Sequence, residues 1–278
     1  MDSLLRRRHL EDIVDTDTAY FEAGAESSRG NGFTLVRTPG LEHLAAGCLA
    51  VRVEPPATEE GARRWRLDFE GAVHLAGGHR YRLYLTDRAP ALETELLAHG
   101  YARRFESMLV RDPERAPRGS TRVRLREITS ASGWAEKVRV DGGSTHAPDG
   151  HRVDTRSWAE YEHRKWRSGI IRYFLVDGAD ETCGTVGVVR SATVVRVKNL
   201  LLHPGWRGLG IATEVALAVH ATASATGLPA GLFAAAGGIA ERAYRRAGFR
   251  VVGTVTEFVR EPGGRGPAGI PTDRKGRS

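Results

Sequence analysis

The sequence has few cysteines and no long apolar run. Only two of its 278 residues are cysteine, Cys48 and Cys183, and they lie far apart in apolar stretches. Two such residues indicate neither a disulfide framework nor a cysteine-rich metal site, and no other ligand cluster is visible, so no metal is expected. No stretch reaches the roughly 18–20 apolar residues of a membrane span. No apolar segment follows the basic residues near the N-terminus, as it would in a secretory signal. A cytoplasmic protein without a membrane partner is expected.

The composition is that of a globular protein with a basic excess. Apolar residues make up 41% and charged residues 27% of the chain, the formal net charge is +7 and the sequence pI is about 9.8. Such a charge attracts polyanions, anionic cofactors and acidic carrier proteins. The arginines are spread along the chain rather than gathered in one patch, so nucleic acid is not the expected main partner.

The first half of the sequence alternates like a set of short strands. Runs at 33–37, 49–53, 81–85 and 105–110 are strand-like, and 92–97 is helical. A polar stretch with prolines, 112–119, separates this half from the second. We predict an N-terminal domain over 1–115, a second domain over 120–262 and a disordered basic tail over 263–278.

The second half predicts a mixed α/β domain. Strand 121–128 is followed by helices near 133–140 and from Asp154, which can cap the second helix. Strands at 173–176, 185–190 and 194–202 come next, and then a long helix over 208–226. Strand 232–236, helix 240–247 and strand 250–259 close the order β-α-α-β-β-β-α-β-α-β.

The stretch from Leu200 to Thr213 carries the strongest chemical signal. An apolar strand stops at Pro204, and a glycine-rich turn opens directly into the long helix. The first N–H groups of a helix lack partners, and the helix dipole makes that end positive. Gly208 and Gly210 let main chain approach a bulky anion, so we expect a pyrophosphate cradle. The Lys-Ser/Thr pair of a nucleotide-triphosphate loop and the G-x-G-x-x-G of a dinucleotide fold are both missing.

Two motifs in this half resemble those of the GNAT superfamily of acyltransferases. Arg207-x-x-Gly210-x-Ala212 is similar to its acyl-CoA signature, and the segment 240–249, AERAYRRAGF, is similar to its A-x-x-x-Y-x-x-x-G-F helix and turn. The resemblance covers about 121–260 and implies the GNAT fold, a twisted, mostly antiparallel mixed sheet flanked by helices. Gly100-Tyr101 before a strand echoes Gly248-Phe249, which suggests a tandem protein with a degenerate N-terminal GNAT-like half.

The resemblance implies roles for the matching residues. Tyr244 would protonate the departing thiolate, as a phenol with a pKa near 10 can. An N–H near Leu202 would polarise the thioester carbonyl. Acetyl-CoA or another acyl-CoA would be the co-substrate. The residues expected to bind it are Leu200, Leu201, Leu202, Arg207, Gly208, Leu209, Gly210, Ile211, Ala212 and Thr213.

The sequence departs from the family at the acceptor side. Gly237 stands where many members have an asparagine, and no glutamate is found on the strands beside the cradle. The general base is therefore sought among Glu160, Glu162 and His163 on the helix after Asp154, or in water. Strand alternation places Arg196, Lys198, Leu200 and Leu202 on one face. If that face meets the acceptor, a substrate bearing a carboxylate or phosphate beside its amine would be favoured.

Several alternatives stay open at the level of sequence. A small-molecule amine is the default acceptor, with a peptide amine next. The acyl donor could be an acyl carrier protein instead of acyl-CoA. The chain could be a catalytically silent CoA-binding module or an RNA-associated transferase. Either a monomer or a homodimer is compatible with the sequence.

Overall fold

Strand pairing, rather than sequence order, decides which residues pack together. The computed structural model describes residues 3–113, 122–144, 154–179 and 181–261. The chain divides into two units, one built from residues 1–26 and 105–255 and the other from 27–104 and 256–278. Strands β5 (Ala102–Arg111) and β11 (Arg250–Arg260) contribute residues to both units.

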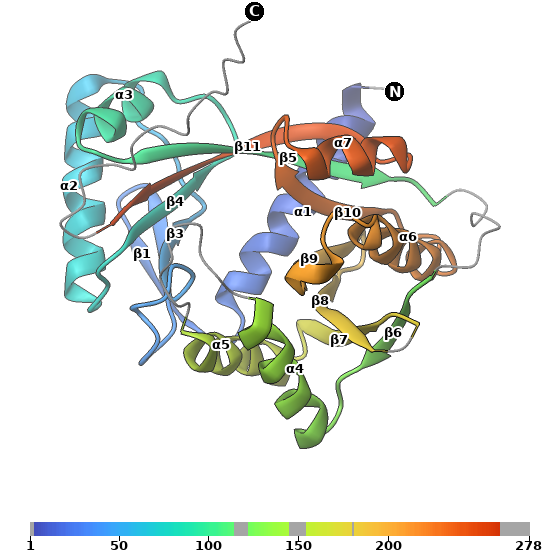
Figure 1. The fold of residues 1–278 in the computed structure, drawn as a ribbon. Coiled ribbons are helices and arrows are strands. Elements are labelled where there is room, and N and C mark those ends of the chain that lie inside the picture. Colours follow the sequence, from blue (N-terminus) through green and yellow to red (C-terminus); the bar gives the residue numbers. More distant parts are fainter. Residues whose placement is uncertain (1–2, 114–121, 145–153, 180, 262–278) are drawn as a thin grey trace, which may run out of the picture. The chain divides into compact units, whose positions relative to one another are not determined.

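The first unit holds the residues that resemble the acyltransferase motifs. Its helices are α1 (Ser3–Glu22), α4 (Ala131–Ser144), α5 (Thr155–Arg167), α6 (Ile211–Ser224) and α7 (Ile239–Arg246), with a 3-10 turn η1 (Pro204–Trp206). Its strands run in the order β11-β5-β10-β9-β8-β7-β6 (Figure 1), with β6 (Arg124–Glu127), β7 (Ile171–Asp177), β8 (Thr182–Arg190), β9 (Val195–Leu202) and β10 (Ala230–Ala235). All its described pairings are antiparallel except the parallel pair of β9 and β10.

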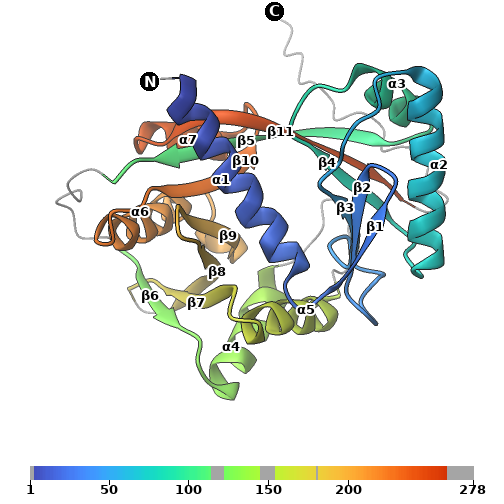
Figure 2. The same cartoon turned by 180° about the vertical axis from the view of Figure 1, so that it is seen from behind.

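Helices cover both faces of this sheet. Val195 and Val197 of β9 pack in a core with Ile211, Val215 and other residues of α6. The alternate residues of β9 point to the opposite face, where α1 runs across the strands (Figure 2). Helices α4 and α5 contact each other, and they contact β8 and β7 respectively.

The second unit has its own core and contains the strands at the other end of the strand order. Its strand order is β1-β2-β3-β4-β11, with β1 (Glu26–Gly30), β2 (Phe33–Arg37), β3 (Cys48–Val51) and β4 (Tyr81–Leu85). Helix α2 (Glu59–Leu75) buries Ala62, Trp65, Phe69 and Val73, and helix α3 (Pro90–Ala98) buries Leu92 and Leu96. The helical spacing of the α2 residues and the hydrogen bond from Gly61 N to Thr58 Oγ1 (3.1 Å) explain why the helix forms and starts there.

The two units follow different boundaries from the expected domains 1–115 and 120–262. Residues 106–111 of β5 pair with β10, from Glu106↔Ala235 to Arg111↔Ala230, so this strand belongs to the sheet of the first unit. Residues 256–260 of β11 pair with β4 in the second unit. Long-range strand exchange of this kind leaves no local mark in the sequence. The expected tail, 263–278, lies outside the described residues.

The predicted elements of the second half are confirmed, with small shifts at their ends. The helix expected from 208 begins at Ile211, because Gly208 and Gly210 have φ angles of +78° and +83°. Helix α2 and strand β1 were not predicted. The cap at Thr58 and the spacing of the buried residues of α2 were available as signals for that helix.

Candidate active site

The turn between β9 and α6 has the conformation that the glycine-rich sequence requires. Gly208 and Gly210 both lie in the left-handed region, which costs an L-residue about 1–2 kcal/mol. No heavy atom lies within 4 Å of a Cβ placed on Gly208, so its backbone conformation, not crowding, calls for glycine. Arg207 Nε donates to Leu202 O at 3.0 Å and ties the turn back to the strand. This contact helps to fix the conformation of the turn.

The start of α6 presents a row of main-chain donors. Within the described part of the chain, no group accepts a hydrogen bond from the backbone N–H of Gly208, Leu209, Gly210, Ile211 or Ala212. Thr213, also expected in the cradle, donates its N–H to Gly210 O (3.0 Å). Arg122, which the sequence analysis missed, adds a guanidinium that contacts Leu209 O and Glu214 Oε1, both at 3.3 Å. This end of the helix therefore suits an anion.

Strands β9 and β10 part after the first two residues of β9, well before this turn. Their pairing comprises Val195↔Ala230 and Arg196↔Gly231, and no later pair is formed among the described residues, while β10 continues along β5 to Ala235. On its other edge β9 is bulged, since the register with β8 shifts between Thr185 and Gly187. Asn199 lies in this bulge with φ of +52°, a conformation that asparagine tolerates better than most residues.

A pocket of about 340 Å³ lies beside the bulged end of β9. The described residues that line it come from α4, α5, β8 and β9: Lys137, Asp141, Thr155, Trp158, Glu162, Thr185, Asn199, Leu200 and Leu201. Leu200 and Leu201 belong to the segment expected to bind the acyl donor. Leu202, expected there as well, packs in the core with α6. The pocket thus adjoins the strand that leads to the cradle.

The wall of the pocket holds a buried group of charges. Lys137 Nζ donates to Asp141 and to Glu162 Oε2, the second at 2.5 Å. Asn199 Nδ2 donates to Glu162 Oε1 at 2.9 Å. Burial raises the pKa of Glu162, and the nearby Asp141 adds to this while Lys137 opposes it. For Lys137, burial alone would lower the pKa, but the two carboxylates outweigh it and raise that pKa.

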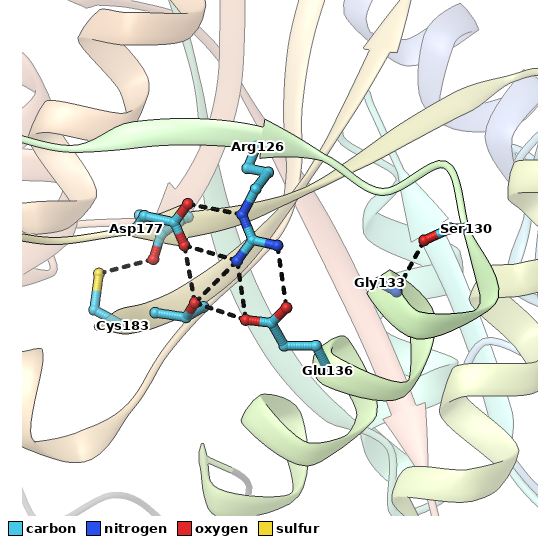
Figure 3. Close-up of polar contacts among 8 residues, drawn as sticks. Arg126, Ser130, Gly133, Glu136, Asp177 and Cys183 are labelled. Atoms are coloured by element: carbon cyan, nitrogen blue, oxygen red, sulfur yellow. Dashed lines mark hydrogen bonds and ion pairs between the residues drawn. The ribbon is translucent and has the colours of Figure 1, made fainter. Parts of the chain in front are cut away.

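Helix α4, which supplies Lys137 and Asp141, is fixed by a polar network on its outer side. Arg126 of β6 lies between Glu136 and Asp177 (Figure 3), with Nη2–Oε1 and Nε–Oδ2 distances of 2.9 and 3.0 Å. Thr182 Oγ1 donates to Glu136 Oε1 at 2.9 Å. At the start of the helix, Gly133 N donates to Ser130 Oγ at 3.2 Å. These contacts hold α4 against β6, β7 and β8.

Of the three candidates for the general base, only Glu162 lines this pocket. Glu160 is exposed and pairs with Arg164. His163 packs against Trp134 and Trp166, with ring centroids 4.9 and 5.2 Å apart, and lines a different, wider pocket between α4 and α5. The two side chains lie on another side of α5 from Glu162.

The expectation that Arg196 and Lys198 share a face with Leu200 and Leu202 is wrong. The bulge at Asn199 inserts a residue and reverses the alternation, so Leu200 and Leu202 pack against the α6 core. Arg196 and Lys198 point to the α1 face, where both pair with Asp17, Lys198 Nζ at 2.5 Å. Neither lines the pocket, and their charges are compensated in part by that carboxylate.

Tyr244 lies on α7 with its ring in the core shared by α6 and the sheet. It is 6% exposed and packs edge-on against Phe249 at 6.1 Å. Its hydroxyl makes no hydrogen bond within the described part of the chain. Burial raises its pKa, so the phenol stays protonated across the neutral range.

Comparisons with known proteins agree with this architecture. Residues 144–260 match the family model described as the acetyltransferase (GNAT) domain. No curated protein matches the chain significantly. Among the described residues, no helix is long and apolar enough to cross a membrane.

Solved structures of similar shape share little sequence with the chain. A functionally unknown conserved protein from Staphylococcus epidermidis ATCC 12228 is 13% identical, with 86% of this chain and 94% of that chain covered and a TM-score of 0.65. A GCN5-related N-acetyltransferase from Kribbella flavida is 17% identical, with 91% and 95% covered and a TM-score of 0.62. A tandem GNAT protein from the clavulanic acid biosynthesis pathway is 12% identical, with 84% and 79% covered and a TM-score of 0.54. The chain therefore has the mixed α/β GNAT fold, and the match to the acetyltransferase (GNAT) domain model lies in its C-terminal half.

Proposed function

We propose that the protein is an N-acyltransferase that moves an acyl group, by default acetyl, from acyl-CoA to the primary amine of a small molecule. The observation that carries this proposal is the row of main-chain N–H groups from Gly208 to Ala212 beside the parted strands β9 and β10. A diphosphate fits such donors at a helix N-terminus. The pantetheine arm would then run along the end of β9 as an added strand, next to Leu200 and Leu201.

Glu162 is the proton acceptor in this proposal. It is the candidate that lines the pocket adjoining β9, and its raised pKa suits a base working near neutral pH. Asn199 and Lys137 each donate to one of its oxygens and hold the carboxylate in place. Asp141 and Thr185 complete the arrangement, because Thr185 Oγ1 donates to Asp141 Oδ1 at 2.7 Å.

The reaction needs three proton transfers around one exchange of bonds. Glu162 takes a proton from the substrate ammonium, and the neutral amine attacks the thioester carbonyl carbon. The new C–N bond forms, the C–S bond breaks, and the thiolate takes a proton from Tyr244. The nitrogen of the new amide then loses its remaining extra proton, either to solvent or to Glu162 once Glu162 has released its first proton to solvent. Tyr244 regains a proton from solvent. Main-chain N–H groups near the β9 bulge would stabilise the oxyanion.

The second unit is proposed to be a degenerate GNAT-like half, which makes the protein a tandem member. The similarity to a structure described as a tandem GNAT protein supports this reading, at 12% identity. In the described residues of the second unit no R-x-x-G-x-A motif follows a strand. The catalytic work is therefore assigned to the first unit.

Two measurements on the purified protein test the proposal together. Calorimetry should detect CoA binding, and a thiol assay with acetyl-CoA should show amine-dependent release of CoA across a panel of small amines. Binding of CoA without transfer to any amine would favour a silent binding module. Transfer from an acyl carrier protein but not from acyl-CoA would reassign the donor. If the protein neither binds CoA nor transfers an acyl group, the proposal is refuted.

A further inference from the structure

The charges in the pocket beside β9 are not balanced. One cation, Lys137, meets two carboxylates, Asp141 and Glu162, so this described group carries an excess of one negative charge when all three are ionised. No other charged side chain belongs to the described lining. The potential inside the pocket is therefore negative, although the chain as a whole is basic.

All three charged side chains line the pocket, but those of the two carboxylates are more exposed than that of Lys137. The side chain of Lys137 is 2% exposed, whereas those of Glu162 and Asp141 are 9% and 12% exposed. Lys137 Nζ also lies over the ring of Tyr173, 5.1 Å from its centroid. The cation is thus enclosed by its partners and by an aromatic face, and an incoming group meets the carboxylate oxygens first.

Glu162 has room for a further donor. From the described residues, each of its oxygens accepts one hydrogen bond, Oε1 from Asn199 and Oε2 from Lys137. A carboxylate oxygen offers about two acceptor sites, so both retain a lone pair. An ammonium has three N–H donors and a positive charge, which matches that remaining capacity.

Apart from the charged group and the uncharged polar residues Thr155, Thr185 and Asn199, the described lining is apolar, and the pocket is small. Trp158, Leu200 and Leu201 form its apolar wall, and Trp158 packs edge-on against Tyr161 with centroids 5.5 Å apart. A volume of about 340 Å³ is at the lower end of small-molecule sites. This size and lining suit a compact apolar or aromatic body next to the amine.

We propose that the acceptor is a small cationic amine with an apolar or aromatic body and no carboxylate, bound with its ammonium on Glu162 and Asp141. This inference rests on the proposed function and narrows its substrate class. It replaces the expectation of an anionic acceptor, since Arg196 and Lys198 pair with Asp17 on the other face of β9. A carboxylate on the substrate would be repelled by Glu162 and Asp141. Lys137 would not offset this repulsion, because it is already paired with both of them.

Matched probes test the inference: 2-phenylethylamine, phenylalanine and 2-phenylethanol. They share one aromatic body and differ in the carboxylate and the ammonium. With acetyl-CoA, kcat/KM for 2-phenylethylamine should exceed that for phenylalanine by about 100-fold or more, because the carboxylate of phenylalanine would face the like charges of Glu162 and Asp141. Calorimetry with the protein–CoA complex should detect 2-phenylethylamine and neither of the other two compounds.

Variants locate the effect in the pocket. Asp141→Asn should raise the KM for 2-phenylethylamine about tenfold, as expected for one lost charge partner, while Asp15→Asn on the exposed side of α1 should leave it unchanged. If Asp141→Asn does not fold, Trp158→Ala should weaken 2-phenylethylamine binding by a similar factor through loss of the apolar wall.

The outcomes separate this inference from the proposed function. Equal handling of phenylalanine and 2-phenylethylamine, or no binding of any probe to a CoA-loaded protein, overturns the inference while acyl-CoA chemistry stands. Failure of the protein to bind CoA and to release it with any amine overturns the proposed function itself.

Discussion

Asn199 donates from Nδ2 to Glu162 Oε1 at 2.9 Å. This hydrogen bond connects the bulge of β9 with α5, the helix that carries the candidate base. The same amide also lies 2.9 Å from the Tyr20 hydroxyl and 3.3 Å from that of Tyr173. The left-handed backbone of Asn199 directs this side chain to the buried group of charges. The bulge therefore shapes both the pocket beside β9 and the end of that strand.

Replacement of Glu162 by glutamine should remove the base and keep the shape of the side chain. We expect kcat/KM for amine acylation to fall by about 10²–10⁴. Because the pKa of Glu162 is raised, wild-type activity should rise with pH through a limb above the usual range of glutamate, and this limb should vanish in the variant. A pH profile of kcat/KM measures both effects.

Glu127→Gln is the matched control for that change, since Glu127 lies on β6 and pairs only loosely with Arg172 at 3.6 Å. It should retain the wild-type rate and pH profile. If Glu162→Gln loses activity but its kcat/KM still rises with pH as in the wild type, Glu162 has a structural role and is not the base.

Replacement of Tyr244 by phenylalanine should slow acyl transfer and spare CoA binding. The ring keeps its packing against Phe249, so stability should change little, while the proton donor is lost. We expect kcat to fall by about 10²-fold, the lower end for general acid catalysis. The decisive comparison is kcat against the CoA dissociation constant; an unchanged kcat would exclude Tyr244 as the acid.

Gly210→Ala should weaken CoA binding through the backbone. Gly210 has φ of +83°, and a Cβ there would come no closer than 3.5 Å to Arg122 Nη2, so the strain is conformational, about 1–2 kcal/mol. Relief of that strain would turn the N–H groups away from the anion. Isothermal calorimetry should show CoA affinity reduced about tenfold or more.

Gly227→Ala supplies the control for the same strain. Gly227 follows α6 with φ of +71° and has no heavy atom within 4 Å of an added Cβ. The two variants should lose similar thermal stability, and only Gly210→Ala should lose CoA affinity. Equal loss of CoA affinity in both would mean that global destabilisation, not the cradle, is responsible.

The Asp17 carboxylate should stabilise the folded protein, and this stabilisation should be lost at low pH. Burial alone would raise its pKa, but Arg196 and Lys198 outweigh burial and lower it from 3.8 to about 2. A lowered folded-state pKa means that the contribution is fully present above the unfolded-state pKa and is lost as pH falls through about 2. Asp17→Asn should lower the free energy of unfolding by about 3–5 kcal/mol near pH 6.

Thermal denaturation between pH 6 and pH 2 measures this dependence. The difference in Tm between wild type and Asp17→Asn should be constant down to about pH 4 and narrow below it. A difference that does not change with pH would show that the carboxylate charge is not what stabilises this contact.

Local patterns predict the turn between β9 and α6 well because its conformation is set locally. The end of an apolar strand, Pro204 and two glycines before a helical repeat specify a turn with free N–H groups, and the structure has this turn. The order of elements from β6 to β11 follows from periodicity and capping for the same reason. Asp154, for example, accepts from Ser157 N at 3.1 Å at the start of α5.

Long-range features could not be predicted in the same way. The bulge at Asn199 changes which side chains share a face, and a single residue gives only a weak signal for it. Lys137 and Asp141, four residues apart on α4, look like an ordinary solvent-exposed helix pair in the sequence. Their burial against Glu162 depends on how α4, α5 and β9 pack, as does the pairing of β5 with β10.

Calorimetric titration of the wild-type protein with CoA and, separately, with pantetheine tests the central claim most directly. Pantetheine lacks the diphosphate, so the N–H groups from Gly208 to Ala212 have nothing to bind in it. We predict that CoA binds and that pantetheine binds at least about 100-fold more weakly, since hydrogen bonds to a charged group contribute about 1.5–3 kcal/mol each. Equal affinity for both compounds, or no heat of binding with CoA, would contradict the account.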